Sequence, residues 1–320
     1  MHNYRNRLLM PLGLLIIVAL ISVSAQASAA PAGFPQKPIE AVYHTAAGGG
    51  GDIFLRLFSR AAEKALGQPV VVNNVVGGSG YNAWSYVSSA KNDGYTILGI
   101  SPALVSGPLN NNMPISFRNF EPIALYFVDP IVYFVLDESP FKTMQDVIDY
   151  VKAHPGELKV AGGTAGATYQ MAHVMFVNAL GLNMPIVPYE GGGEQMAAVL
   201  GGHLPIGCGN FNDAAEHLEL GTMRVLVTFN KMNEFPEIPD MTEIGHPGVI
   251  MEMFRGLAAP KGTDPEIIKF IAECYKTAYD DPEFKEYIKA NYLVPTYKTG
   301  SDVIATFERY EQQLKDLKAQ

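Results

Sequence analysis

The sequence predicts an α/β protein made of two domains. Apolar, strand-like runs alternate with segments whose apolar residues recur at helical spacing, a pattern typical of mostly parallel sheets flanked by helices. Four of the loops that connect a predicted strand to the next helix are rich in glycine, at 48–51, 77–80, 162–166 and 191–193. Ligands of such sheets bind beyond the carboxyl ends of the strands, so these four loops are the first candidates for a site.

The N-terminus has the pattern of a secretory signal peptide over residues 1–29. Two arginines precede an apolar core over 8–23, and the small residues Ala27 to Ala29 form a cleavage site. An uncleaved membrane anchor is the alternative, but the apolar core is short for a span. The absence of cysteine near the cleavage site argues against a lipid-anchored form. We therefore expect an exported, periplasmic protein.

Charge and cysteine content exclude several partners. Cleavage would remove two arginines and no acids, which changes the formal charge from −9 to −11. So acidic a chain is a poor match for nucleic acid or anionic lipid, which basic surfaces bind. Cys208 and Cys274 lie far apart, and we expect two buried thiols rather than a disulfide, although spacing alone does not decide. We expect no metal, no cofactor and a monomer.

The first domain is expected to begin with three strands, each followed by a glycine-rich or polar loop. The first helix carries a buried stripe that includes Phe54 and Phe58, and Gly67 is placed to end it. A second, short helix is expected around 83–87. Parallel strands would bring all three loops, and Ser101 with them, to one rim. These strands are expected at 39–45, 69–73 and 95–100, and the first helix at 53–67.

The second domain is expected to begin where Asp129-Pro130 separates two β-rich runs at 123–128 and 131–136. Thr143 and Asp146 have the spacing of a capping box at a helix start. The final helices would return to the first domain, which gives lobe 1 as 30–129 with 241–320, and lobe 2 as 130–240. Further strands are expected at 158–161, 186–189, 204–208, 223–228 and 251–259, and helices at 143–154, 171–180, 194–200, 214–220, 265–275, 281–291 and 301–318.

Glycine loops that open helices favour anion binding. Without a Cβ the backbone can approach a guest closely, and the free N–H groups of the first helical turn point at it from the positive end of the helix dipole. Any one such loop is more often a tight turn that packs a helix on a strand. Four of them, two in each predicted domain, would face each other across one cleft.

Catalysis has weaker support. Gly77 to Tyr81 falls one glycine short of a nucleophile elbow, and the match of 78–83 to a dinucleotide fingerprint has no acidic residue in the expected place. An exported hydrolase that uses Ser79 or Thr164 remains an alternative, and it would need a base within hydrogen-bond reach. His173 sits among apolar residues, as a satisfied core histidine would. His44 is a ligand candidate because it lies at the mouth of the first glycine loop.

Six motifs, in order along the chain, resemble the Bug family, the substrate-binding proteins of tripartite tricarboxylate transporters. The likeness runs from about Phe34 to the end of the chain. The motifs are Ala46–Asp52 (AAGGGGD), Gly67–Val72 (GQPVVV), Asp93–Thr96 (DGYT), Val187–Gly192 (VPYEGG), Leu200–Gly202 (LGG) and Gly256–Thr263 (GLAAPKGT). The resemblance implies a two-lobed periplasmic binding protein of the type II kind, which holds a small carboxylate between its lobes by backbone donors and ordered waters.

The resemblance also implies which segments bind the ligand. They are Thr45–Asp52 and Gly77–Asn82 in one lobe, and Gly163–Thr168, Asn210 and Asp213 in the other. Arg255 is a further candidate, either as a substrate salt bridge or as a surface arginine. The predicted contacts are His44, Thr45, Ala46, Ala47, Gly50, Gly51, Asp52, Gly78, Ser79, Gly80, Tyr81, Ser101, Gly163, Thr164, Ala165, Gly166, Thr168, Asn210, Asp213 and Arg255.

Three departures from the family pattern affect the substrate. Gly51 stands where the family usually has Thr or Ser, His44 replaces a common Pro, and Tyr81 replaces a common Asn. Our hypothesis is a non-catalytic receptor for a di- or tricarboxylate or an aromatic acid, which it would deliver to membrane transporter subunits. A sensor subunit that presents the bound acid to a kinase is the other alternative.

Overall fold

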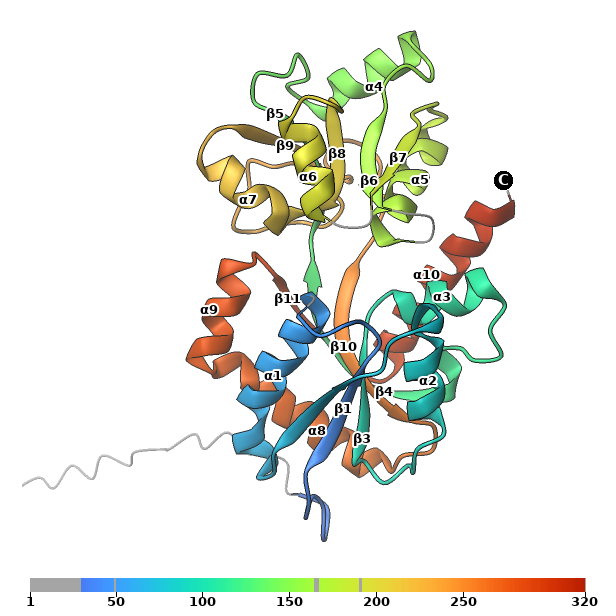
Figure 1. The fold of residues 1–320 in the computed structure, drawn as a ribbon, viewed down its shortest axis with the longest axis vertical. Helices are drawn as coiled ribbons and strands as arrows, with labels where there is room; N and C mark the ends of the chain where they lie inside the picture. Colours follow the sequence, from blue (N-terminus) through green and yellow to red (C-terminus); the bar gives the residue numbers. More distant parts are fainter. Residues whose placement is uncertain (1–29, 49, 164–166, 190–191, 320) are drawn as a thin grey trace, which may run out of the picture.

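The protein, described by a computed structural model, folds into two α/β lobes that are joined by crossing strands (Figure 1). The structure describes residues 30–48, 50–163, 167–189 and 192–319. The expected signal peptide lies outside these ranges. Within them, no helix is long and apolar enough to cross a membrane.

A six-stranded sheet forms the core of the first lobe, in the order β11-β4-β10-β3-β1-β2. β1 pairs in parallel with β2 and β3, whereas β10 pairs antiparallel with both β3 and β4. The parallel set carries the first two glycine loops and Ser101 to one rim, as predicted. The six strands of this sheet are β1 (Ile39–Tyr43), β2 (Val70–Asn74), β3 (Thr96–Ile100), β4 (Phe120–Asp129), β10 (Met253–Pro260) and β11 (Val294–Lys298).

A five-stranded sheet forms the second lobe, in the order β7-β6-β8-β5-β9. β6 pairs in parallel with β7 and β8, and β5 pairs antiparallel with β8 and β9. β4 ends at Asp129 and β5 begins at Ile131, so the chain changes sheet at Pro130. The strands are β5 (Ile131–Leu136), β6 (Val160–Gly163), β7 (Ile186–Tyr189), β8 (Ile206–Asn210) and β9 (Met223–Thr228).

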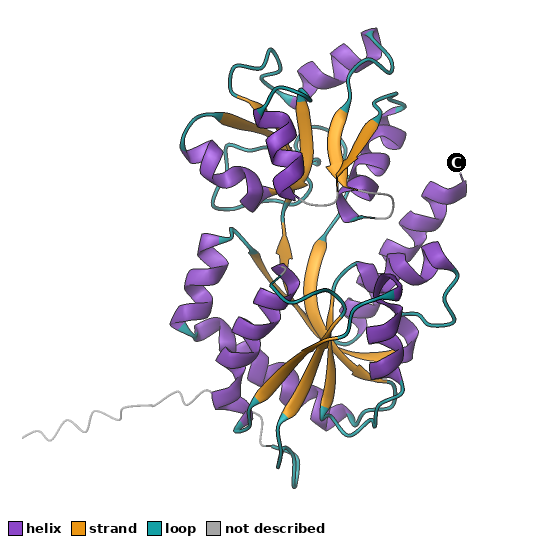
Figure 2. Ribbon diagram, in the orientation of Figure 1, coloured by secondary structure: helices purple, strands orange, loops and turns teal. Residues whose placement is uncertain are grey.

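The helices cover both sheets (Figure 2). Those of the first lobe are α1 (Gly50–Leu66), α2 (Tyr81–Ser88), α3 (Ala103–Asn111), α8 (Pro265–Thr277), α9 (Pro282–Ala290) and α10 (Ser301–Ala319). Those of the second lobe are α4 (Met144–Ala153), α5 (Thr168–Leu180), α6 (Gly192–Leu200) and α7 (Phe211–Glu219). Three short 3-10 turns join them, at Gly78–Gly80, Phe117–Asn119 and Ala278–Asp280.

The two rims that carry the glycine loops face each other. Ile100, at the carboxyl end of β3, pairs with Gly256 near the start of β10, where the chain has just crossed from the second lobe. Asn210, at the carboxyl end of β8, pairs with Ile131, where the chain has just crossed from the first. Both sets of parallel strands therefore point their carboxyl ends at the crossing strands, as Figure 1 shows.

The first helix and its cladding agree with the sequence pattern. Phe54 and Phe58 are buried on α1, and Gly67 ends that helix with a positive φ of 70°. The Ser59 hydroxyl hydrogen-bonds the Tyr275 hydroxyl of α8 at 2.9 Å, within a cluster of aromatic rings. The capping box of Thr143 and Asp146 is also present at the start of α4.

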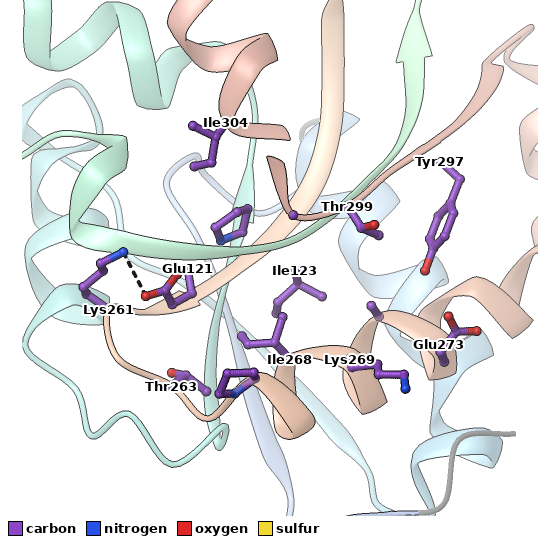
Figure 3. A pocket seen from close by; sticks show the side chains of 14 residues that line it. Glu121, Ile123, Lys261, Thr263, Ile268, Lys269, Glu273, Tyr297, Thr299 and Ile304 are labelled. Atoms are coloured by element: carbon purple, nitrogen blue, oxygen red, sulfur yellow. Dashed lines mark ion pairs between the residues drawn. The ribbon is translucent and has the colours of Figure 1, made fainter. Parts of the chain in front are cut away.

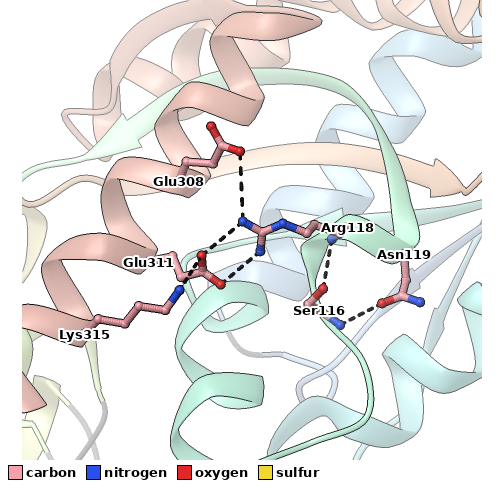
Figure 4. A network of polar contacts seen from close by, with 6 residues as sticks. All are labelled: Ser116, Arg118, Asn119, Glu308, Glu311 and Lys315. Carbon is pink, nitrogen blue, oxygen red and sulfur yellow. Dashed lines mark hydrogen bonds and ion pairs between the residues drawn. The ribbon is translucent and has the colours of Figure 1, made fainter.

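The final helix packs on the first lobe, as expected, and also contacts the second. α10 packs along α3, and its acidic side chains bind the turn before β4: Arg118 donates to Glu311 at 3.0 and 3.1 Å (Figure 4). On the same helix, Tyr310 donates to the Met171 sulfur of α5 at 3.8 Å. α10 therefore contacts both lobes.

Two elements were not predicted, and a third begins earlier. α3 contains Gly107 and Pro108, which indicate a helix break, but Gly107 is small because the Trp84 ring lies 2.5 Å from where its Cβ would be. β11 is short, alternates between partly buried and exposed residues and contains proline. Asn210 ends β8, and α7 begins directly after it at Phe211, earlier than the predicted helix at 214–220.

Both cysteines are free and buried, which confirms that expectation. His173 is a satisfied core histidine, as predicted: its Nδ1 lies 2.8 Å from the Tyr133 hydroxyl and its Nε2 lies 2.7 Å from the Met184 carbonyl oxygen. The ring is 2% exposed. Burial lowers the pKa of His173 to about 4, and the bond to Met184 offsets only part of this effect.

This buried ring predicts loss of stability in acid. Between pH 6.5 and 4 the unfolded chain binds a proton at residue 173 that the folded chain does not, so acidification lowers the free energy of unfolding. We expect urea unfolding at pH 7 and pH 4.5 to show a loss that is roughly 2–3 kcal/mol smaller in His173→Leu than in the wild-type protein. Equal losses in the two proteins would mean that His173 does not titrate in this way.

Candidate functional site

The first glycine loop is fixed by a chain of polar contacts. Asp52, in the first turn of α1, accepts a hydrogen bond from the Gly48 N–H at 2.8 Å and is paired with Arg56, whose Nε lies 2.9 Å from Oδ1. Arg56 also donates to Asn74 at the end of β2, and Asn74 donates to the Thr45 carbonyl at 3.0 Å. Burial would raise the pKa of Asp52, but the bonds from Arg56 and Gly48 outweigh it and hold that pKa below its usual range.

The second loop has an unusual backbone. Gly77, Gly78, Ser79 and Gly80 all have positive φ, at 110°, 58°, 53° and 98°. Only glycine adopts such angles without strain, which explains three of the four residues. The loop lies on Trp84, whose ring would come within 2.4 Å of a Cβ at position 80. The sequence therefore builds a bare stretch of backbone that leads directly into α2.

Four helix starts on the two rims lack side-chain caps, whereas three helix starts elsewhere have them. α4, α8 and α9 begin with Thr143, Asp264 and Asp281, whose side chains accept from the first turn. α2, α3 and α5 begin after Gly80, Pro102 and Ala167, which carry no side-chain oxygen. α7 follows Asn210, whose side chain makes no capping bond to the described residues. The first N–H groups of the rim helices are thus not bound by their caps.

The second lobe places its predicted residues around these helix starts. Gly163 ends β6 and is buried, and Thr168 is the first residue of α5. The predicted contacts Thr164, Ala165 and Gly166 lie outside the described residues. Asp213, in the first turn of α7, lies against the first residue of α6: its Oδ2 is 2.2 Å from where a Cβ of Gly192 would be. The start of α6 therefore already has a carboxylate of the protein beside it.

Arg255 is bound by the protein's own acid. It donates from Nε and Nη2 to Asp129 Oδ2 at 3.2 and 2.8 Å, and from Nη1 to the Tyr43 hydroxyl at 3.1 Å. The arginine side chain is 13% exposed and that of Asp129 14%, so Arg255 is not a surface arginine. The pair joins β10 to the end of β4, where the chain crosses between lobes. From the sequence, Asp129 was predicted to mark the passage between the two domains, but its pairing with Arg255 was not predicted.

A cavity of about 220 Å³ lies beside this ion pair. Gly50 at the start of α1, Asn210 at the end of β8 and Arg255 on β10 meet there. The Oδ1 atom of Asn210 is buried and has no hydrogen-bond partner among the described residues. The full lining is Gly50, Ile53, Phe54, Phe127, Asp129, Asn210, Asn212, Arg255, Tyr287, Asn291 and Leu293.

His44 lies directly after β1, close to the first loop. Its ring stacks at a tilt on Trp84, with centroids 5.8 Å apart, and its Nδ1 is buried without a partner in the described part of the chain. Burial, together with the positive charge of Arg255, lowers the pKa of His44 to about 4. The ring is therefore neutral at neutral pH and supplies no cation.

The remaining predicted contacts all belong to the first lobe. Thr45, Ala46 and Ala47 are exposed in the first loop, and Ser101 is buried at the end of β3. Tyr81, the first residue of α2, lines a hollow along that helix with Asn82 and Tyr86. A cavity of about 620 Å³ at the opposite side of the first lobe, where Lys261 pairs with Glu121, contains no predicted contact (Figure 3).

The Tyr43 ring explains why position 51 is glycine here. A Cβ on Gly51 would lie 2.2 Å from Tyr43 Cε1, and one on Gly99 would lie 2.5 Å from Tyr43 Cδ2. We expect Gly51→Ala to lower the free energy of unfolding by ~1–3 kcal/mol through overpacking. Gly50→Ala is the control, because a Cβ there meets nothing within 4 Å. Urea unfolding that gives the same stability for both variants would contradict the assigned cause.

The sequence model of the tripartite tricarboxylate transporter family receptor, TctC, matches residues 54–315. The chain belongs to this family. It is 32% identical to a UPF0065 protein of Cupriavidus necator over 91% of this chain and 88% of the relative. It is 28% identical to protein BugT of Bordetella pertussis over 92% of this chain and 91% of that one. The resemblance to the Bug family is confirmed.

Solved structures have the same two-lobed fold, which confirms the predicted fold class. A TctC solute-binding protein from Polaromonas, without ligand, aligns with this receptor at a TM-score of 0.80 and 25% identity, covering 89% of this chain and 98% of that one. MatC of Rhodopseudomonas palustris with bound malate aligns at 0.71 and 22%, covering 89% and 99%. Rpa4515 of R. palustris with adipate aligns at 0.72 and 22%, covering 89% and 97%. This family and fold are those of solute-binding proteins.

Proposed function

We propose that this receptor captures a small carboxylate between its two lobes in the periplasm and delivers it to the membrane subunits of a tripartite tricarboxylate transporter. The observation that carries the proposal is the distribution of helix caps. The helix starts at the facing rims lack side-chain caps, at α2, α3, α5 and α7, whereas α4, α8 and α9 are capped. Backbone N–H groups that no cap binds are suited to a carboxylate.

The relatives support the same class of ligand. MatC was solved with malate and Rpa4515 with adipate, and both are small organic acids. These two proteins share the fold of this receptor. The ligand here is therefore proposed as a small acid, in which at least one carboxylate meets the helix starts of α2 and α5.

Backbone donors are strong enough to explain binding without a free cation. A hydrogen bond to a charged group contributes ~1.5–3 kcal/mol net. Each helix start adds ~0.3–1 kcal/mol. Three or four such donors with two helix starts approach the ~8 kcal/mol of a micromolar complex. Arg255 is not required as the carboxylate's partner, because Asp129 already binds it.

A thermal-shift screen tests the proposal. Purified protein is heated with monocarboxylates, dicarboxylates, tricarboxylates and aromatic acids, each over a range of concentrations. A true ligand raises Tm as the logarithm of its excess over Kd. The matching alcohols and amides serve as controls and should leave Tm unchanged. If no organic acid moves the transition, the proposed function is wrong.

The proposal makes the protein a receptor and not an enzyme. The hydrolase alternative requires a base beside Ser79 or Thr164. Among the described residues, no hydrogen bond joins Ser79 to a histidine or a lysine, and Thr164 lies outside them. We expect incubation of purified protein with the esters of the bound acid to release no acid above the buffer rate, in contrast to a hydrolase.

A further inference from the structure

The 220 Å³ cavity at the lobe junction offers an unused hydrogen-bond acceptor. Asn210 lines it, and its buried Oδ1 has no partner among the described residues. Asn210 occupies the N-cap position of α7, where an asparagine oxygen ordinarily accepts from the first turn of the helix, but the capping bond is not made. A buried acceptor without a donor is costly, so a donor from a ligand would be favourable here.

The charges around this cavity disfavour a second carboxylate. Arg255, the one cation among the described residues of its lining, is bound to Asp129 and Tyr43. Burial, and then the negative charge of Asp129, raise the pKa of Asp213, in the first turn of α7, to about 6, which leaves Asp213 mostly ionised at pH 7. His44 is neutral at pH 7. Among the described residues that line the cavity, the charged ones are Arg255 and Asp129, which bind each other, so no free cation is left for a second carboxylate.

The rest of the cavity suits a short carbon chain. Ile53, Phe54, Phe127 and Leu293 form its apolar side. Both hydrogen bonds from Arg255 go to Asp129 Oδ2, so they leave the second oxygen of Asp129 able to accept another bond. A ligand in this cavity would thus meet an apolar surface together with two acceptors, one on Asn210 and one on Asp129.

We propose that the ligand of this receptor carries, at a few carbons from the carboxylate held by the helix starts, a hydroxyl or ammonium group that donates a hydrogen bond to Asn210. The ligand class is therefore a short hydroxy acid or amino acid and not a simple dicarboxylate. This inference rests on the function proposed above and specifies its substrate. The hydroxyl and the ammonium share one property, donation to an acceptor.

A matched series of acids tests the inference by isothermal titration calorimetry. At four carbons the series is butanoate, 4-hydroxybutanoate, 4-aminobutanoate and butanedioate, and it is repeated with five and six carbons. At the chain length that binds tightest, the hydroxyl or ammonium member should have a Kd about 10- to 100-fold lower than the methyl and carboxylate members. Tightest binding by the dicarboxylate or by the unsubstituted acid would overturn the inference and leave the receptor function intact.

Two asparagine variants locate the effect. Asn210→Leu should remove most of the advantage of the hydroxyl or ammonium member while it changes the affinity for the unsubstituted acid little. Asn178→Leu is the matched control in the same lobe, because Asn178 is exposed on α5, and it should keep the advantage in full. Thermal unfolding of both variants checks that each is folded. An advantage that survives in folded Asn210→Leu would show that another residue recognises the donor.

Discussion

Replacing Asp129 with asparagine is expected to lower the free energy of unfolding by ~3–5 kcal/mol, because it leaves the buried Arg255 without its counter-charge. Arg255 places two of its N–H donors on one oxygen of Asp129, and both side chains are largely inaccessible to water. The pair also joins β4 to β10, the strands along which the chain crosses between the lobes. Urea unfolding of the wild type and the variant measures the loss.

An exposed pair is the control for this prediction. Arg224 and Asp137 form an ion pair whose side chains are 31% and 50% exposed, so Asp137→Asn should cost less than ~1 kcal/mol. Combining Asp129→Asn with Arg255→Met should restore part of the stability, since the unpaired charge is then gone. A loss from Asp129→Asn no larger than that from Asp137→Asn would show that the crossing strands do not depend on the buried pair.

Gly78→Val is expected to weaken binding of the acid found in the thermal-shift screen by more than 100-fold, because it affects the bare backbone before α2 in two ways. Its Cβ would lie 3.1 Å from Tyr81 Cβ, and its φ of 58° is one that a β-branched residue rarely adopts. Losing one or two charge-assisted bonds at ~1.5–3 kcal/mol each gives a factor of this size. Calorimetry measures the affinity.

The control is a glycine that has a similar positive φ but lies where we expect no contact with the ligand. Gly202 follows α6, has a φ of 68°, and would place a Cβ where nothing lies within 4 Å. Gly202→Val should therefore carry a similar backbone strain and keep wild-type affinity. If Gly78→Val also binds like the wild type, the second loop is a packing feature only.

Much of the fold follows from the sequence, and the exceptions have physical causes. The stripe of Phe54 and Phe58 and the stop at Gly67 locate α1 because burial and a positive φ leave a local signature. α3 lacks that signature, since Gly107 is required by the Trp84 ring, which contacts it from another helix. Such a requirement comes from tertiary packing and has no counterpart in the local sequence.

The site divides in the same way. The helix start without a side-chain cap at α2 could be predicted from the glycines at 78 and 80. The glycine loops at both rims could also be predicted from the sequence. The partner of Arg255 could not, because Asp129 is 126 residues away and the pairing depends on how β4 and β10 align. The reason for glycine at position 51 could not be predicted either, because only the structure shows that the Tyr43 ring occupies the place of a Cβ there. Ion pairs between residues far apart in the sequence, such as Arg255 with Asp129, therefore determine the charge of the site and with it the kind of acid that we expect to bind.

A crystal structure of the protein with the tightest-binding acid from the thermal-shift screen tests the central claim most directly. The account predicts a carboxylate between the lobes, with its oxygens at about 2.7–2.9 Å from backbone N–H groups at the starts of α2 and α5. Arg255 should still be paired with Asp129 in that complex. A carboxylate bound directly to Arg255, or an acid seated in a part of the molecule away from these helix starts, would contradict the account.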